Sequence, residues 1–221
     1  MKVRFLGHSC VEIVGRHHIL IDPDFTNEPL SGVEYICITH AHSDHIGRVA
    51  EVSDGIILAS PDVCEVAMKL GVSCERLHPV RVGDQVANIR VLPGYSSTNE
   101  IIYTIIVLLF LHRKPESAGT PLSFFIDDDA SLYHNGDAYK APLNVTPDIL
   151  CLPWRNVPFR SNQYKETLVQ MTKQINPRYV LPIHHDLQGR EADLSEVTEK
   201  INVPVLNGYR WYCFYDKEHV S

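Results

Sequence analysis

The chain has 221 residues, of which 44% are apolar and 21% charged. These values are typical of a globular protein with a sizeable core and exclude a disordered chain. The length suits one large unit, so we predict a single domain over residues 1–221. The formal net charge of -7 gives no general attraction to nucleic acid or to anionic lipid, and we expect neither as a partner.

The start of the chain lacks the apolar core of a signal peptide, because Gly7, His8, Ser9 and Glu12 interrupt it. The apolar run Ile101–Leu111 is shorter than the roughly 20 residues that a membrane-spanning helix needs, and it predicts a buried strand. We therefore expect a cytoplasmic protein. Six cysteines without a C-x-x-C pair favour buried free thiols over disulfides or a cysteine zinc site: Cys10, Cys37, Cys64, Cys74, Cys151 and Cys213.

The first part of the chain predicts a β-meander followed by a helix. Short β-like runs alternate with turn residues at Val3–Leu6, Cys10–Val14, His18–Ile21, Tyr35–Thr39 and Ile56–Ala59. Ser60 and Pro61 then form a helix start, and Gly71 is a stop signal. Between them, one face of the predicted helix carries Val63, Val66, Ala67 and Leu70.

Further strands are expected at Ile89–Leu92, Ile101–Leu111, Ser123–Ile126 and Ser131–His134, with an exposed hairpin loop at Arg113–Pro121. Strands and helices then alternate. Strands are predicted at Asp148–Leu152, Arg178–Leu181, Pro204–Leu206 and Trp211–Tyr215, and helices at Ser161–Ile175 and Leu194–Ile201. Many strands early and strand–helix alternation late fit two packed β-sheets flanked by helices, an α/β (α+β) fold.

Potential metal ligands are concentrated in one loop, Thr39-His40-Ala41-His42-Ser43-Asp44-His45, directly after a predicted buried strand. Imidazoles two positions apart can converge on one cation, and the adjacent Asp44 and His45 can face a second. Nitrogen and carboxylate ligands suit Zn²⁺, Mn²⁺ or Fe²⁺. The alternative is a solvated polar loop in which Asp44 caps the segment that follows.

Two later strands also end in candidate ligands. Asp137 follows the run Leu132-Tyr133-His134-Asn135-Gly136, where a carboxylate could bridge two cations, although an Asn-Gly turn with a surface aspartate has the same pattern. His184 and His185 follow Arg178–Leu181 and sit at a predicted sheet rim, where functional sites collect.

These residues resemble the metallo-β-lactamase superfamily, whose hallmark is an H-x-H-x-D-H loop after a strand, matched by His40 through His45. Leu6-Gly7-His8-Ser9, Ile21-Asp22-Pro23 and Tyr133 to Asp137 look like its compact branch, which contains ascorbate-phosphate lactonase and related metal-dependent hydrolases. The resemblance spans nearly the whole chain. It implies a four-layer αββα sandwich of two mixed β-sheets flanked by helices.

The resemblance also implies a ligand set. One metal would lie on His40 and His42, a second on Asp44, His45 and His184, and Asp137 would stand between them. His8 and Asp22 match the branch pattern without being ligands in it, and we place them near the site as orienting or substrate-contacting groups.

One family ligand is missing from this pattern. The third histidine of the first metal normally follows a strand, but here the loop after Ile89–Leu92 reads Pro93-Gly94-Tyr95-Ser96-Ser97. His78 and His112 are the nearest histidines and lie outside the motif. The first site is then weak or empty, recruits Tyr95, Ser96, water or a displaced His8, or fills only with substrate.

The function that follows is metal-dependent hydrolysis, with one or two zinc ions supplying hydroxide and Asp44 orienting it. We expect a small, anionic substrate containing an ester, lactone or phosphoester. His185 and Tyr139 are candidate proton donors, and Trp154, Arg155 and Arg160 are candidates for shaping an anion-accepting pocket. The alternatives are a phosphodiesterase acting on nucleic acid or phospholipid, and a non-catalytic metal- or ligand-binding protein. The oligomeric state is left open.

Overall fold

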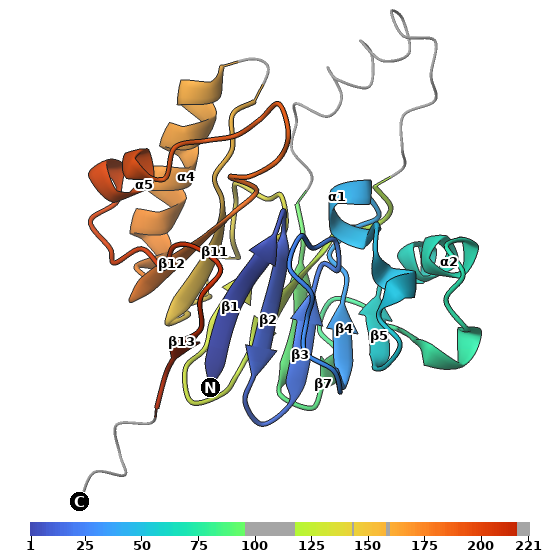
Figure 1. Ribbon diagram of the computed structural model, residues 1–221. Coiled ribbons are helices and arrows are strands. Elements are labelled where there is room, and N and C mark those ends of the chain that lie inside the picture. Colours follow the sequence, from blue (N-terminus) through green and yellow to red (C-terminus); the bar gives the residue numbers. More distant parts are fainter. Residues whose placement is uncertain (96–117, 143, 158–159, 216–221) are drawn as a thin grey trace, which may run out of the picture.

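The computed structural model describes residues 1–95, 118–142, 144–157 and 160–215. Within them, the strands form two mixed sheets that face each other (Figure 1). The predicted strand Ile101–Leu111 and most of the predicted loop Arg113–Pro121 lie outside the described residues. No helix among the described residues is both long and apolar enough to cross a membrane.

The first sheet has the strand order β13-β1-β2-β3-β4-β5-β6. Its strands are β1 (Lys2–Gly7), β2 (Cys10–Val14), β3 (His18–Ile21), β4 (Tyr35–Cys37), β5 (Ile56–Ala59), β6 (Leu77–Pro79) and β13 (Tyr212–Cys213). β1, β2 and β3 form an antiparallel meander, whereas β3 to β6 run parallel. The predicted meander is therefore confirmed for β1 to β3, whereas the next two predicted strands, β4 and β5, join the sheet in parallel.

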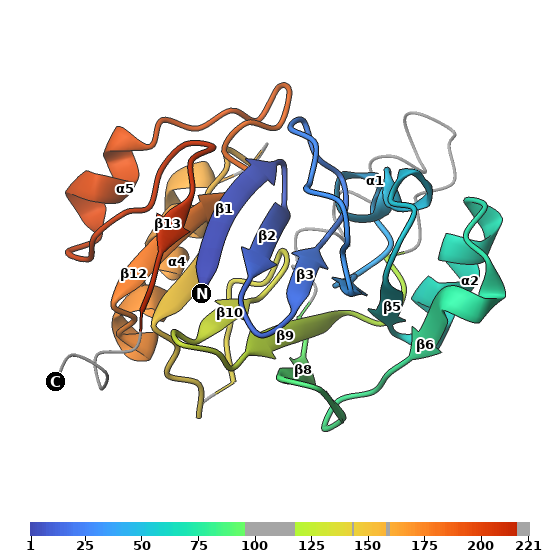
Figure 2. The same ribbon diagram turned by 60° about the horizontal axis from the view of Figure 1, so that its bottom comes forward.

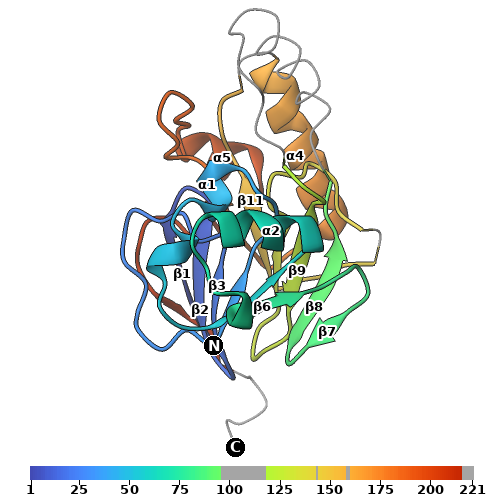
Figure 3. The same cartoon turned by 90° about the vertical axis from the view of Figure 1, so that its right-hand side faces the viewer.

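The second sheet has the order β12-β11-β10-β9-β8-β7. Its strands are β7 (Gln85–Val86), β8 (Ile89–Pro93), β9 (Leu122–Ile126), β10 (Leu132–His134), β11 (Ile149–Pro153) and β12 (Tyr179–Ile183). β10, β11 and β12 are parallel. Figures 2 and 3 show this sheet facing the first, with β8 and β9 opposite β1 to β3.

Helices cover the outer faces. α1 (Ser43–Ile46) and α2 (Pro61–Lys69) belong to the first sheet, together with the 3-10 turns Val49–Glu51 and Cys74–Arg76. α4 (Ser161–Ile175) and α5 (Ser195–Lys200) belong to the second sheet. The predicted helices over 161–175 and 194–201 are confirmed, the second one residue shorter at each end. The layers follow the predicted αββα order.

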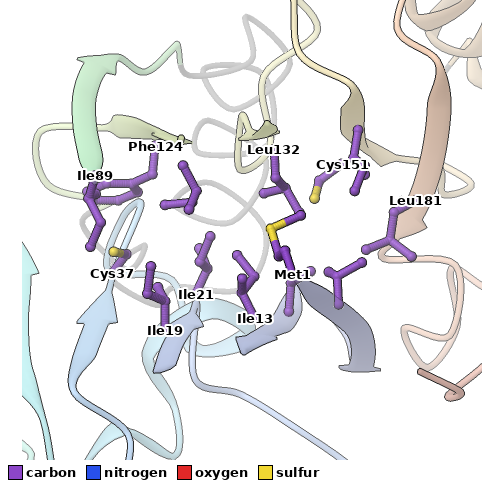
Figure 4. Packing of buried hydrophobic residues seen from close by; sticks show 14 of the residues in the cluster. Met1, Ile13, Ile19, Ile21, Cys37, Ile89, Phe124, Leu132, Cys151 and Leu181 are labelled. Carbon is purple, nitrogen blue, oxygen red and sulfur yellow. The ribbon is translucent and has the colours of Figure 1, made fainter. Parts of the chain in front are cut away.

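The core follows from the period-two alternation of strand side chains. On β3, Ile19 and Ile21 face the other sheet, whereas Leu20 packs beneath the helices of the first sheet. On β11, Ile149 faces the first sheet and Leu150 packs under α4. Figure 4 shows side chains of both sheets pointing into the layer between them. This apolar layer fixes the position of one sheet relative to the other.

Candidate metal centre

Parallel strands of each sheet end at one edge of the sandwich, and the candidate ligands follow those ends. β3 and β4 run parallel and lead into Asp22 and the 40–45 loop, while β10 and β12 lead into Asp137 and His184. The loop itself forms α1, so that Asp44 and His45 lie in its first turn. Because strand ends of both sheets meet here, residues distant in sequence become neighbours.

Two overlapping groups of side chains converge at this edge. In one, ligand atoms of Asp44, His45 and His184 lie within 4.8 Å of one another; in the other, those of His40, His45 and Asp137 do. Asp137 joins the groups, because its Oδ1 is 3.0 Å from His184 Nε2 and 3.3 Å from His45 Nε2. The chain thus gathers imidazoles and carboxylates at ligand distances.

Several buried nitrogens in this cluster make no hydrogen bond of good geometry, even where a carboxylate oxygen is as near as 3.0 Å. They are Nε2 of His45 and both ring nitrogens of His184, and both residues are fully buried. An unpaired buried polar atom costs about 1–3 kcal/mol, so native structures seldom keep one without a purpose. A neutral imidazole offers one nitrogen lone pair, so the residues fit a divalent cation that would accept one lone pair from His45 and one from His184.

Asp22 orients His45 from behind. Its Oδ2 lies 2.7 Å from His45 Nδ1, and it also accepts hydrogen bonds from the Thr39 backbone N–H at 2.7 Å and the Thr39 hydroxyl at 2.8 Å. Burial opposes ionisation of Asp22, but the neighbouring His45 imidazole lowers its pKa. A carboxylate can only accept, so Nδ1 of His45 carries the proton and Nε2 is left to bind a metal.

The charges around His45 favour a cation. Burial alone would lower the pKa of His45, yet Asp22, Asp44 and Asp137 raise it well above its ordinary value. In contrast, the pKa of His184 and that of His40 are lowered, mainly by burial, so both imidazoles are neutral and can act as ligands. The carboxylates thus attract positive charge, and the neutral histidines supply lone pairs for it.

Left-handed backbone marks the site. His8, Asp22 and His184 have φ values of 50°, 52° and 63°, although none is glycine. Such conformations cost on the order of 1 kcal/mol or more and persist where the surrounding structure enforces them. The loops after β1 and β12 are joined directly, because the backbone N–H of His184 donates to the His8 carbonyl at 2.5 Å. This tie connects the two sheets beside the metal ligands.

A match to a family model covers most of the chain. The beta-lactamase superfamily domain matches residues 2–184, from β1 to the last candidate ligand. The chain belongs to this superfamily. The resemblance inferred from the 40–45 loop is confirmed.

Relatives in the superfamily have a similar length. A UPF0173 protein of Pyrococcus furiosus is 28% identical over 91% of this chain and 90% of its own. A UPF0173 metal-dependent hydrolase of Thermoplasma acidophilum is 24% identical over 84% of each. The structure of Igni18, a metallo hydrolase of Ignicoccus hospitalis, aligns with a TM-score of 0.67 at 20% identity over 96% of this chain and 97% of its own. The predicted fold is confirmed. The expected metal-dependent hydrolase activity agrees with the names of the Thermoplasma acidophilum and Ignicoccus hospitalis proteins.

Most of the predicted ligands of this superfamily member lie together. Asp44, His45, Asp137 and His184 form one cluster, and His40 joins it through Asp137, with His40 Nε2 4.0 Å from Asp137 Oδ2. His42 is the outlier. Its Nδ1 is 3.0 Å from His40 Nε2, but it belongs to neither three-residue group among the described residues. The predicted first metal therefore has the histidine pair His40 and His42 close together, as expected, with His42 outside both groups of three.

The candidates for the missing third ligand of the first metal differ in position. His78 is exposed on β6. His8 is engaged by Asp24, because its Nδ1 is 2.6 Å from Asp24 Oδ2. Tyr95 lines a small pocket with His40 and Asp137, and it is 37% exposed. Ser96 and His112 lie outside the described residues.

The candidate proton donors, His185 and Tyr139, and the candidate pocket residues, Trp154, Arg155 and Arg160, lie in different surroundings. The His185 ring packs on Phe5 with centroids 4.8 Å apart, and Tyr139 packs against the core beneath α4. Arg160 is the N-cap residue that precedes α4, and Trp154 is fully buried. The interpretation of Arg155 as part of an anion-accepting pocket is wrong, because this guanidinium binds Asp137 instead.

Sequence reasoning missed the contact between Arg155 and Asp137. Arg155 Nη1 and Nη2 each lie 2.7 Å from one oxygen of Asp137, and the two side chains are almost completely buried. Burial opposes ionisation of Asp137, but Arg155 holds its pKa well below the usual range. The signal in the sequence was a single arginine directly after a strand, which is usually a solvated surface residue.

Proposed function

We propose that this chain is a metal-dependent hydrolase that cleaves a small ester, lactone or phosphoester. One observation carries the proposal: Asp44, His45 and His184 bring ligand atoms within 4.8 Å of one another, and His45 Nε2 and the ring nitrogens of His184 are buried without a hydrogen bond. Two histidines and one carboxylate are a ligand set that zinc uses in hydrolases. We infer zinc as the ion, with Mn²⁺ or Fe²⁺ as the alternative for the same ligands.

A divalent cation held there supplies Lewis acidity, which makes water a nucleophile at neutral pH and polarises an acyl or phosphoryl group. The chain's own residues do the positioning. Asp22 holds the proton on His45 Nδ1, and Asp44 keeps 27% of its side chain exposed while its Oδ2 lies 3.6 Å from His184 Nδ1. Asp44 is thus the ligand that can also accept a proton from an attacking water, and we propose it as the catalytic residue.

The proposed substrate is a small molecule. A small pocket beside the cluster is lined by Tyr95, His40 and Asp137 together with Thr39, Asn135 and Gly136. The net charge of -7 disfavours a polyanion as substrate. We therefore place small esters, lactones and phosphomonoesters ahead of nucleic acid.

The first experiment measures metal per chain by elemental analysis in protein purified without chelator. Wild type should carry metal, and His45→Ala and His184→Ala should lose it. His78→Ala is the control, because this exposed histidine is on β6, away from the cluster. The same proteins are then assayed with p-nitrophenyl acetate, γ-butyrolactone, p-nitrophenyl phosphate and bis-p-nitrophenyl phosphate.

Metal-dependent turnover of any of the first three compounds supports the proposal, provided that His184→Ala abolishes it and His78→Ala does not. Turnover of the diester alone would favour the phosphodiesterase. Metal without turnover of any substrate would favour a binding protein. Absence of metal in wild type, even after dialysis against Zn²⁺ and Mn²⁺, would contradict the proposal.

A further inference from the structure

Arg155 brings a permanent positive charge into the metal cluster. It follows β11, is 5% exposed, and uses both Nη atoms to bind both oxygens of Asp137 at 2.7 Å. Two parallel charge-assisted hydrogen bonds make this a strong pair, and each carboxylate oxygen has a cationic partner. The aspartate expected to stand between two metal ions thus already has one cation.

The charge balance of the cluster favours a single divalent ion. Three carboxylates surround His45, from Asp22, Asp44 and Asp137, and Arg155 neutralises one of these negative charges. One divalent cation neutralises the other two. A second divalent cation would leave an excess of two positive charges in a largely buried site, which is unfavourable because buried charge is costly unless paired.

The number of available ligand atoms also favours a single cation. The two groups of potential ligands share His45, whose Nδ1 is bound to Asp22, so only Nε2 is left. One nitrogen lone pair cannot serve two cations. Asp137 Oδ2, the carboxylate atom nearest to His40 Nε2 at 4.0 Å, is held by Arg155 Nη2. Among the residues that the structure describes, the carboxylate within reach of His40 is therefore one whose negative charge Arg155 already neutralises.

We propose that Arg155 takes the electrostatic place of one of two metal ions, so that the chain binds a single divalent cation on Asp44, His45 and His184. Asp137 Oδ1 is 3.0 Å from His184 Nε2 and 3.3 Å from His45 Nε2, and His40 and His42 would not be required to hold the cation. The proposal rests on the metal-binding function proposed above, and it adds the stoichiometry of the site and the residue that sets it.

The test counts Zn²⁺ per chain by equilibrium dialysis under saturating Zn²⁺, with circular dichroism to verify folding. Wild type should bind one ion. Arg155→Met removes the charge, keeps an unbranched apolar side chain and frees both oxygens of Asp137, so we expect two ions. Arg155→Lys keeps the charge and should bind one. Adding His40→Ala to Arg155→Met should return the count to one.

A second set of variants does not depend on the folding of Arg155→Met. In the wild-type background, His40→Ala should keep one ion with a dissociation constant changed by less than about threefold, whereas His184→Ala should lose it. Two ions in wild type, loss of the ion in His40→Ala, or a folded Arg155→Met that stays at one ion would each overturn the role of Arg155. Those results leave the proposed hydrolase intact; zero ions in wild type would contradict the hydrolase itself.

Discussion

At the scale of single residues, Asp22 shows how a side chain that touches no ion can control a metal ligand. Its oxygens bind Thr39 and His45 and fix the tautomer and the orientation of that imidazole. Asp22→Asn replaces one oxygen with a donor, which faces another donor at His45 Nδ1 or at Thr39. We expect metal affinity to fall by about 10- to 100-fold.

Competition with a chromophoric chelator measures this affinity. Asp62→Asn is the matched control, because Asp62 also accepts several hydrogen bonds, from Ser60 and Thr120, but sits at the start of α2. Equal affinities in wild type and Asp22→Asn would refute the orienting role.

Glu12 is a buried carboxylate outside the site, on β2. It binds Arg4, His18 and the backbone N–H of Leu30. Burial opposes its ionisation, but these hydrogen bonds together lower its pKa from the ordinary value of 4.5. Stability from this group is thus fully present above about pH 4.5 and is lost as pH falls through the lowered pKa of the folded state.

Glu12→Gln removes that contribution. We expect the free energy of unfolding at pH 7, measured with urea on metal-free protein, to fall by about 1–3 kcal/mol. Between pH 5 and pH 3 the variant should lose stability less steeply than wild type. Parallel pH profiles for the two proteins would count against this account.

At the scale of elements, the ends of strands matter more than their middles. The strand predicted over Tyr35–Thr39 stops at Cys37, because the Thr39 N–H is donated to the Asp22 carboxylate instead of to a neighbouring strand. The short strands β6 and β7 were not predicted, since two or three residues carry no readable periodicity. α1 was also missed, because it has only four residues and two of them, Asp44 and His45, are themselves candidate ligands.

The turn after β10 places Asp137, and Gly136 makes it possible. Gly136 has φ +57°, and a Cβ there would lie 2.8 Å from Thr39 Oγ1. Gly136→Ala should cost about 1–3 kcal/mol of stability from the left-handed backbone and should also displace Thr39, weakening metal binding. Urea unfolding and chelator competition measure the two effects.

Gly32→Ala separates the effect of the left-handed backbone from the effect of the contact with Thr39. Gly32 has φ +83°, but a Cβ there meets nothing within 4 Å. This control should lose stability through the backbone alone and keep the metal affinity of wild type. If both variants bind metal equally well, the contact with Thr39 is not important for the site.

At the scale of the whole molecule, the metal ligands connect the two sheets. Asp44 and His45 follow β4 of the first sheet, and His184 follows β12 of the second. An unfolded chain cannot present this set, so a cation should stabilise the native state by about 2.7 kcal/mol at a free concentration 100 times its dissociation constant.

Thermal unfolding tests this coupling. For a chain of this size that free energy should raise Tm by roughly 5–10 °C over chelator-treated protein. The rise should vanish in His184→Ala. An unchanged Tm in wild type at saturating metal would mean that the cation does not bridge the sheets.

The sequence by itself determined the local features of this protein. The loop from His40 to His45 holds its ligands within six residues, and strand periodicity marks the alternating core, so neither depends on a distant contact. Membership of the superfamily and the layered fold followed from those local patterns and were confirmed.

Only the tertiary structure decided which candidate residues meet. Asp22 contacts His45 across 23 residues, and Arg155 contacts Asp137 across 18, because parallel strands of each sheet bring their ends to one edge. No spacing rule predicts such pairs, since a side chain after a strand can face solvent or the site with the same sequence around it. The partner of Arg155 is set by the register between β10 and β11, which is a property of the folded sheet.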